Sequence, residues 1–449
     1  EGFRRTAPDP FVLAVLLTLV TLVLVLVRTD MGFDAAVRAW AGTEGVWSAG
    51  LLKFAMQMCL ILVTGHALAS SPPVSRGLDW LAGRPGGPAS AVGLVAVVSV
   101  CLGSLNWGLG LIAGALLARR VGLAMEKRGV VVHYPLLAAA GYMAMLVFHG
   151  GFSGSAPLKV TTEAQIADIF GSDAPFGALS MRETVLSPMN LFVTGGLLLI
   201  VPLLLVLMHP KRAEDVRGAG AYGVGAEGEA PEADPDKPLV PRALEDTPAV
   251  SWILVGMIGW WAWGYYVPDE GPSGVTRLTP DTVNLTVLML GLLLHGTPAR
   301  YVRAVEGAAR GCAGIILQFP LYAGIMGLMG VSGLSAELAG AMAEGSSRTT
   351  MPLLTLVSAG VVNLFVPSGG GQWAVQGPIA MQAAADAGVS PGKMVMAVAY
   401  GDQLTNMLQP FWALPLLAIT GAKARDIVGY TAIVMVIAGV WMALGLLVF

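Results

Sequence analysis

Long apolar runs alternate with short polar stretches along the chain, and this pattern predicts membrane-spanning helices. A helix needs about 20 predominantly apolar residues to cross a bilayer. We assign nine crossings, at about residues 11–28, 51–70, 134–157, 188–208, 250–267, 282–297, 311–330, 394–419 and 427–449. The pattern therefore predicts an all-α polytopic membrane protein.

Two other apolar regions, at about 91–118 and 351–386, are interrupted in the middle by small and polar residues. The second is interrupted by Ser368-Gly-Gly-Gly-Gln-Trp373, and the first by Gly103-Ser-Leu-Asn-Trp-Gly108. Non-helical backbone survives at membrane depth only where protein buries it or where it lines a wet cavity. Each region is thus predicted to be a re-entrant helical hairpin whose tip holds a ligand. The alternative is a pair of soluble core helices joined by a glycine loop.

The crossing that follows each hairpin is itself interrupted, at 149–157 and at 401–410. A hairpin and an interrupted helix thus recur in the same order in two segments, 1–209 and 281–449, which begin on opposite sides of the membrane. The polar tract 210–249 is typical of a flexible linker, and the helix at 250–267 inverts the second segment. Inverted repeats with discontinuous helices are the layout of secondary transporters.

Composition agrees with a membrane protein and narrows its partners. Hydrophobic residues make up 55% of the 449 residues, charged residues 12%, and mean hydropathy is +0.70. Soluble domains carry roughly twice that charged fraction. The net charge of −3 argues against a nucleic-acid partner. The three cysteines lie far apart in apolar segments, which argues against a disulfide framework or a zinc site.

Two segments need an interpretation of their own. The run 11–28 lacks a signal-peptide cleavage site and is interpreted as the first membrane helix. The stretch 71–88 is interpreted as a turn-rich loop.

The basic residues favour one orientation in the membrane. With the N-terminus in the cytoplasm and both hairpins returning to their own side, 18 of the 26 Lys and Arg residues fall inside. Cytoplasmic loops carry such an excess of basic residues. The outside set is Arg28, Arg38, Lys53, Lys159, Arg182, Arg277, Arg348 and Lys393.

The four polar interruptions would converge if the two repeats face each other. Broken helices offer free N–H groups to an anion and free carbonyl groups to a cation. No basic cluster lies at the interruptions, which suits a small monoanion better than a di- or tricarboxylate. The predicted substrate contacts are Ser104, Asn106, Trp107, Gly108, His149, Ser153, Ser155, Ser368, Gly369, Gly370, Gly371, Gln372, Trp373, Thr405 and Asn406.

Some of these residues have a predicted role of their own. Trp107 and Trp373 are predicted to wall an apolar pocket for a short alkyl tail. Asp402 lies in a membrane segment, where an acidic side chain is usually there for a function. His149 is either a proton carrier or a cap of the broken helix. Lys53 and Lys159 are predicted to extend to the outer surface. The candidates for binding a coupling ion, Na⁺ or H⁺, are Ser104, Asn106, Asp402 and Asn406.

Two other classes of function use the same residues. An intramembrane enzyme would take His149 as base and Ser153 or Ser155 as nucleophile, yet no orienting acid lies nearby in the sequence. An anion channel or uniporter could use the same polar breaks without a coupling ion. The sequence assigns no role to the acidic loop 158–183.

The stretch Phe365-Val-Pro-Ser-Gly-Gly-Gly-Gln-Trp-Ala-Val-Gln-Gly-Pro378 closely resembles a motif of the short-chain fatty acid transporter family, the AtoE-type permeases. Leu105-Asn-Trp-Gly108, His133-Tyr-Pro-Leu136 and His149-Gly-Gly-Phe-Ser-Gly-Ser155 are similar to that family's first-half motifs. The resemblance covers nearly the whole chain.

This resemblance implies uptake of short-chain monocarboxylates such as acetoacetate and butyrate across the bacterial inner membrane. It also implies a place in the ion transporter superfamily, whose known members are mostly homodimers with a scaffold and a moving transport domain. In the sodium–dicarboxylate branch, Ser-Asn-Thr hairpin tips bind sodium and substrate. Here the tips are Ser104-Leu-Asn106 and Ser368-Gly-Gly-Gly-Gln372, so symport with a proton and symport with sodium both stay open. Beyond that ion no cofactor is expected.

Overall fold

The computed structural model describes residues 9–170, 174–223, 238–269, 274–277, 279–341 and 347–449. Arg4, Arg5 and Lys237 of the predicted cytoplasmic set lie outside the described residues, as do the centre of the tract 210–249 and part of the loop 158–183.

Every regular element in the described residues is a helix, which confirms the predicted all-α membrane fold. A helix satisfies its own backbone hydrogen bonds, as a bilayer requires. Eight segments in these residues are long and apolar enough to cross a membrane: α2 (Pro10–Arg28), α4 (Ala49–Ser70), α6 (Pro88–Leu105), α7 (Trp107–Lys127), the interrupted Tyr134–Lys159, α12 (Pro188–Leu207), α17 (Ala313–Val331) and α23 (Ala424–Val448).

The remaining helices are shorter, less apolar or broken. Several connect or flank the long ones: α3 (Phe33–Ala41), α5 (Pro72–Ala82), α11 (Glu163–Phe170), α13 (Leu239–Glu245), α14 (Ala249–Tyr266), α15 (Pro280–His295), α16 (Pro298–Ala309) and α18 (Leu334–Ala341). The first interrupted helix consists of α8 (Tyr134–Tyr142), α9 (Ala144–Val147), η1 (Phe148–Gly150) and α10 (Ser155–Lys159). The second hairpin and interrupted helix are α19 (Met351–Phe365), α20 (Gly369–Ala387), α21 (Pro391–Thr405), η7 (Asn406–Leu408) and α22 (Pro410–Thr420).

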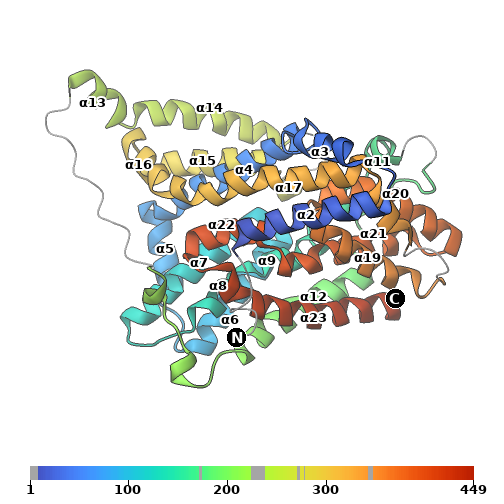
Figure 1. The fold of residues 1–449 in the computed structure, drawn as a ribbon. Coiled ribbons are helices and arrows are strands. Elements are labelled where there is room, and N and C mark those ends of the chain that lie inside the picture. The colour runs from blue at the N-terminus through green and yellow to red at the C-terminus, as the bar shows by residue number, and fades with distance from the viewer. Residues whose placement is uncertain (1–8, 171–173, 224–237, 270–273, 278, 342–346) are drawn as a thin grey trace.

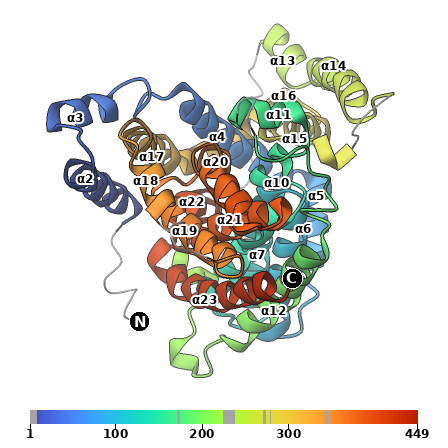
Figure 2. The same ribbon diagram turned by 90° about the vertical axis from the view of Figure 1, so that its right-hand side faces the viewer.

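The helices form two groups that lie side by side. In Figure 1 the group α2, α3, α4, α14, α15, α16 and α17 lies above the group α6 to α9, α12, α19 and α21 to α23. Figure 2 looks along the bundle and shows α20 and α21 near its centre, with α14 at the edge. The second group holds the first hairpin and, apart from α10 and α20, both interrupted helices and the second hairpin.

Glycines let the hairpin helices pack closely, as in many membrane helix pairs. A Cβ on Gly110 of α7 would lie 2.4 Å from the backbone nitrogen of Gly103 on α6, and a Cβ on Gly401 of α21 would lie 2.2 Å from the carbonyl oxygen of Leu356 on α19. The first hairpin extends beyond the predicted 91–118 because α7 continues to Lys127. Within this extension, Arg120 pairs with Asp79 of α5 at 2.9 Å. Its arms are thus long enough to cross a bilayer, and the re-entrant path and the inverted repeat stay predictions.

Two stretches that the sequence presents as irregular have structure. The prediction of a loop at 71–88 is wrong, since Pro72 and Pro73 begin the helix α5, where proline is favoured. The predicted flexible linker begins as a docked segment. Arg217 pairs with Asp426 of α23 at 3.0 Å, and Gly220 donates its N–H to Glu126 Oε2 of α7 at 2.9 Å.

Candidate functional site

The tip of the first hairpin is a single extended residue, Asn106, between α6 and α7. Its side chain accepts a hydrogen bond from the N–H of Leu109 at 3.1 Å and so caps α7. The N–H of Trp107 donates to Ser153 Oγ at 3.0 Å, and the N–H of Phe152 donates to the carbonyl of Ser104 at 2.8 Å. The tip is thereby fastened to the break in the first interrupted helix.

The tip of the second hairpin has the same plan. Ser368 is extended, and its hydroxyl accepts a hydrogen bond from the N–H of Gly371 at 3.2 Å, which caps α20. The first N–H groups of a helix have no partner within the helix. Those of Gly369 and Gly370 also have no side-chain partner in the described part of the chain. They are therefore available to an anion.

The two interrupted helices meet at His149 and Asp402, whose side chains are 1% and 4% exposed. His149 Nε2 lies 3.1 Å from Asp402 Oδ1. The N–H of His149 also donates to Gln403 Oε1 at 3.0 Å, and the hydroxyl of Tyr142 donates to the carbonyl of Asn406 at 2.8 Å. These hydrogen bonds join segments that are more than 250 residues apart in the chain.

Asn363 of α19 connects the second hairpin to its interrupted helix. Its amide nitrogen lies 2.7 Å from the carbonyl oxygen of Asp402, 3.0 Å from Thr405 Oγ1 and 2.9 Å from Asn406 Oδ1. Gln409 donates to the carbonyl of Asn363. Asn363 is not among the residues predicted for the site from the sequence, although an amide in the apolar run of α19 is a signal that could identify it.

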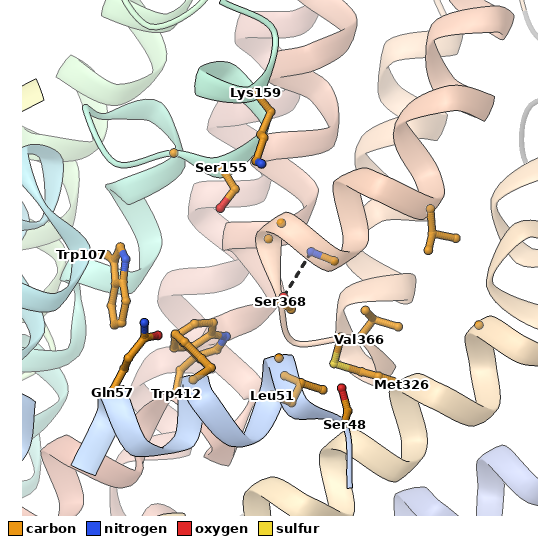
Figure 3. Close-up of a pocket in the computed structure, with 18 of the residues that line it drawn as sticks. Ser48, Leu51, Gln57, Trp107, Ser155, Lys159, Met326, Val366, Ser368 and Trp412 are labelled. Carbon is orange, nitrogen blue, oxygen red and sulfur yellow. Dashed lines mark hydrogen bonds between the residues drawn. The ribbon is translucent and has the colours of Figure 1, made fainter. Parts of the chain in front are cut away.

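A cavity of about 1000 Å³ lies between the two tips and the helices α4 and α17 (Figure 3). Among its lining residues, Gly50 at the start of α4, Thr279 before α15 and Val331 at the end of α17 are exposed, so we take the mouth of the cavity to lie there. Of the predicted substrate contacts, eight line it: Asn106, Trp107, Ser153, Ser155, Ser368, Gly369, Gly370 and Gly371.

The other predicted contacts do not line this cavity. Gln372 is buried and donates to the carbonyl of Ala359 at 2.8 Å and to Gln376 Oε1 at 2.9 Å. Ser104 donates its hydroxyl hydrogen to the carbonyl of Val100. Gly108, His149 and Asn406 are buried as well, as is the ion candidate Asp402, and Thr405 is half-buried.

The apolar wall of the cavity differs from the predicted one. Trp373 is fully buried and packs against Phe170 of α11, with ring centroids 5.9 Å apart, so it does not reach the cavity. Trp412 of α22 takes that place, with its ring centroid 5.4 Å from that of Trp107 and 5.7 Å from that of Phe54. Trp107 lines the cavity, and its contact with an alkyl tail stays a prediction, whereas Trp373 does not line the cavity because α20 turns that ring away from it.

Lys159 lines the cavity and is not confined to the outer surface as predicted. In Figure 3 its ammonium group lies beside Ser155, above the second hairpin tip. It is the only basic side chain among the described lining residues, and Glu44 is the only acidic one. In the described part of the chain no carboxylate forms an ion pair with Lys159. Lys53, by contrast, pairs with Asp281 at 3.2 Å.

The geometry does not assemble the predicted hydrolytic pair. His149 Nδ1 accepts a hydrogen bond from the backbone N–H of Ser155 at 3.3 Å, and the hydroxyl of Ser153 accepts from Trp107. No hydrogen bond between His149 and a serine hydroxyl occurs in the described residues, so neither serine is activated by this base.

Comparison with known proteins gives a match over nearly the whole chain. The sequence profile of a family described as "Short chain fatty acid transporter" matches residues 3–449. A protein of Escherichia coli (strain K12) named "Putative short-chain fatty acid transporter" is 39% identical over 450 residues, which cover 99% of this chain and 97% of that protein. A protein of Haemophilus influenzae with the same name is 38% identical over 430 residues, which cover 94% and 92%. Among solved structures, the Alcanivorax borkumensis YdaH transporter aligns with a TM-score of 0.44 and 19% identity over 98% of this chain and 97% of that one.

Proposed function

This chain belongs to the short-chain fatty acid transporter family, and from that premise we propose that it takes up short-chain monocarboxylates, of the acetoacetate and butyrate type, by alternating access. The observation that carries the proposal is a cavity with one anion-binding end and one aromatic wall. A short-chain carboxylate has the matching two ends.

The anion-binding end is the start of α20. The unpartnered N–H groups of Gly369 and Gly370 lie at the positive end of a helix of 19 residues. Lys159 lines the same cavity. One cation and one helix end balance a monoanion better than they balance a di- or tricarboxylate.

The aromatic wall suits a short alkyl chain. Trp107, Trp412, Phe54 and Phe148 all line the cavity. Each methylene group that leaves water for such a wall contributes about 0.8 kcal/mol. A wall of this kind favours a chain of a few carbons over acetate.

A closed end beneath the cavity supports a carrier rather than an open channel. Phe54 lies one turn deeper on α4 than Gly50, and Phe319 lies about three turns deeper on α17 than Val331. The rings of Phe319 and Phe411 stack there at 4.2 Å, next to Trp412. These buried rings separate the cavity from the other end of the bundle, so a substrate would pass only after a conformational change.

The moving part would contain the two hairpins and the interrupted helices. Hydrogen bonds hold this unit together. The bond of Trp107 to Ser153 joins the first tip to the first interrupted helix, and that of Asn363 to Asp402 joins α19 to α21. The His149–Asp402 contact joins the two interrupted helices. Uptake against a gradient needs a coupled cation, a proton or sodium. We place the protein in a bacterial inner membrane with its N-terminus in the cytoplasm, so that the cavity mouth would face outward. Two copies would form a homodimer.

The test is uptake of labelled acetoacetate and butyrate into proteoliposomes. A proton gradient and a sodium gradient are imposed separately, and protein-free vesicles measure the leak of the neutral acid. Accumulation above that leak is expected with one of the gradients. Equilibration without accumulation would point to a uniporter or channel. No flux, and no exchange of labelled for unlabelled acid, would refute the proposal.

A further inference from the structure

We infer that the His149–Asp402 pair is the coupling site of this transporter and that the cation it binds is a proton. The inference rests on the proposed function. The pair joins η1 to α21 and lies directly behind the cavity wall. A Cβ on Gly369 would lie 2.6 Å from His149 Nε2 and 3.0 Å from Ser155 Oγ, so the tip of α20 covers the pair.

The hydrogen bonds assign the tautomer of His149. Its Nδ1 accepts the backbone N–H of Ser155 at 3.3 Å. A neutral imidazole has one donor and one acceptor nitrogen, so the ring proton lies on Nε2. That N–H therefore points at Asp402 Oδ1, 3.1 Å away. In this state the pair has a net charge of −1, and one further proton makes it neutral.

Neutral polar groups surround the pair. The hydroxyl of Tyr400 donates to Asn190, and that of Tyr142 donates to the carbonyl of Asn406. The elements in contact with η1 or α21 are α6, α9, α10, α12, α19, α20, α23 and η7. Besides the pair itself, the titratable and charged side chains on these elements and on α21 are Cys101, Lys159, Asp386, Lys393, Tyr400, Arg425, Asp426 and Tyr430. Lys159 is the charged group of this set that lines the cavity, and Asp426 pairs with Arg217.

The charge of the pair must influence a carboxylate at the start of α20. In an effective dielectric constant of about 20, a unit charge about 6 Å away changes anion binding roughly 100-fold. A bound carboxylate therefore favours the protonated pair, and by linkage a proton on the pair favours the carboxylate. Together the two cross as an electrically neutral load.

Protonation would also release part of the cavity wall. A proton bound to His149 Nδ1 turns that atom from an acceptor into a donor, and the N–H of Ser155 then faces a second N–H. That hydrogen bond must break, which frees the start of α10. Because α10 carries Ser155 and Lys159, the protonation state of the pair is transmitted to two lining residues.

The proton balance is simple. A proton from the outer solution forms an N–H bond at His149 Nδ1 and is returned to water on the inner side after the carboxylate leaves. Sodium fits this pair less well, because hard cations prefer several oxygen ligands and Asp402 Oδ1 faces an imidazole nitrogen instead.

Two substitutions should act in opposite directions on anion binding. Asp402→Asn keeps an oxygen for the Nε2–H and removes the negative charge that favours a second proton on His149, so we expect tight acetoacetate binding with a much weaker pH dependence than in the wild type. His149→Gln keeps a donor for Asp402 but cannot take the proton, so we expect binding about 100-fold weaker at neutral pH. Damage to the structure alone would weaken binding in both variants. Asp386→Asn, at an exposed acid of α20, is the matched control and should behave as wild type.

The decisive measurement combines transport with binding in proteoliposomes. The wild type should accumulate labelled acetoacetate in an inside-alkaline pH gradient and not in a sodium gradient. Asp402→Asn should lose that accumulation yet exchange labelled for unlabelled acetoacetate at equal pH. Accumulation that is driven by sodium, or that survives in Asp402→Asn, would overturn the proton site while leaving the proposed function intact. Absence of exchange in the wild type would refute the proposed function itself.

A second measurement needs no variant. The increase in melting temperature that acetoacetate gives the purified wild type should grow as the pH is lowered, because the protonated pair binds the anion more tightly. Sodium should not change that increase. An increase that is independent of pH, or one that requires sodium, would overturn the inference even if both variants failed to fold.

Discussion

Asn106 and Ser368 occupy matching positions at the tips of the two hairpins. Each is extended and directly precedes a helix, with φ and ψ of −155° and 128° for Asn106 and of −150° and 104° for Ser368. Each side chain accepts the N–H three residues further on, at 3.1 and 3.2 Å. Such caps determine where a helix starts, so α7 and α20 begin beside the same cavity in the same way.

Replacing Ser368 by Ala should weaken uptake. The change removes the cap on Gly371, which is worth about 1 kcal/mol, and lets the first turn of α20 fray where the carboxylate would bind. We expect the KM for acetoacetate to rise several-fold while the yield of folded protein is unchanged. The matched control is Ser390→Ala, because Ser390 is exposed at the start of α21 and makes no capping hydrogen bond. Equal uptake by wild type and Ser368→Ala would contradict a role of this tip.

Gln372→Ala should act differently, although Gln372 lies only four residues further along. Its buried amide is bonded to Ala359 and Gln376, and its loss leaves a buried carbonyl without this donor, at a cost of about 1–3 kcal/mol. We expect a lower melting temperature in detergent first and lower uptake as a consequence. Unchanged stability with lost uptake would instead show a direct contact with the substrate.

Gly369 and Gly370 should respond in opposite ways to replacement by Ala. A methyl group on Gly369 would lie 2.5 Å from His149 Cε1, and the ring cannot move aside without losing Asp402. No atom lies within 4 Å of a methyl group on Gly370. We expect Gly369→Ala to lower the melting temperature and Gly370→Ala to preserve or raise it, since alanine favours a helix by up to about 1 kcal/mol. The prediction fails if both variants melt alike.

The sequence predicted the interruptions well because they are local. Serine, asparagine and glycine in the middle of an apolar membrane segment usually mark a break in the helix that lines a cavity. Asn106 and Ser368 both lie at such breaks and line the cavity. The sequence also singled out His149 and Asp402. Their contact could not be predicted, since 253 positions separate them and only packing brings them together.

The errors concern which way a side chain points. Trp373 and Trp412 both lie in apolar segments near a break, and only the rotation of α20 and α22 decides that Trp412 faces the cavity. Lys159 was predicted at the outer surface because charged side chains at helix ends usually extend to water. The short helix α10 turns it back toward the second tip instead.

Trp412→Ala should reduce the preference for longer acids. The two methylene groups that distinguish butyrate from acetate are worth about 1.6 kcal/mol when fully buried, or roughly tenfold in affinity. We expect competition assays to show that this preference falls several-fold in the variant. Trp260→Ala, at an exposed position of α14, is the control. A butyrate preference that survives in Trp412→Ala would place the alkyl chain elsewhere.

Lys159→Gln should raise the KM for acetoacetate about three- to tenfold, because the lysine is exposed to the water in the cavity and its attraction is screened. The effect should shrink as the salt concentration rises. Lys53→Gln is the matched control, since Lys53 is paired with Asp281 and does not line the cavity. Similar KM values for both variants would remove Lys159 from the anion-binding end.

Arg217→Ala should detach the segment that the sequence presents as the start of a linker. The substitution leaves the buried Asp426 carboxylate without this guanidinium, but it keeps the backbone carbonyl of residue 217, which accepts the N–H of Tyr134. Removing one member of a buried ion pair is costly. We expect a lower melting temperature and faster proteolysis between residues 211 and 223. The double variant Arg217→Ala with Asp426→Asn should recover much of the melting temperature and still be cleaved, because the charge penalty is gone while the anchor remains absent. Cleavage at the wild-type rate in both variants would mean that the remaining hydrogen bonds hold the segment in place, namely that of Gly220 to Glu126 and those of the residue 217 backbone to His133 and Tyr134.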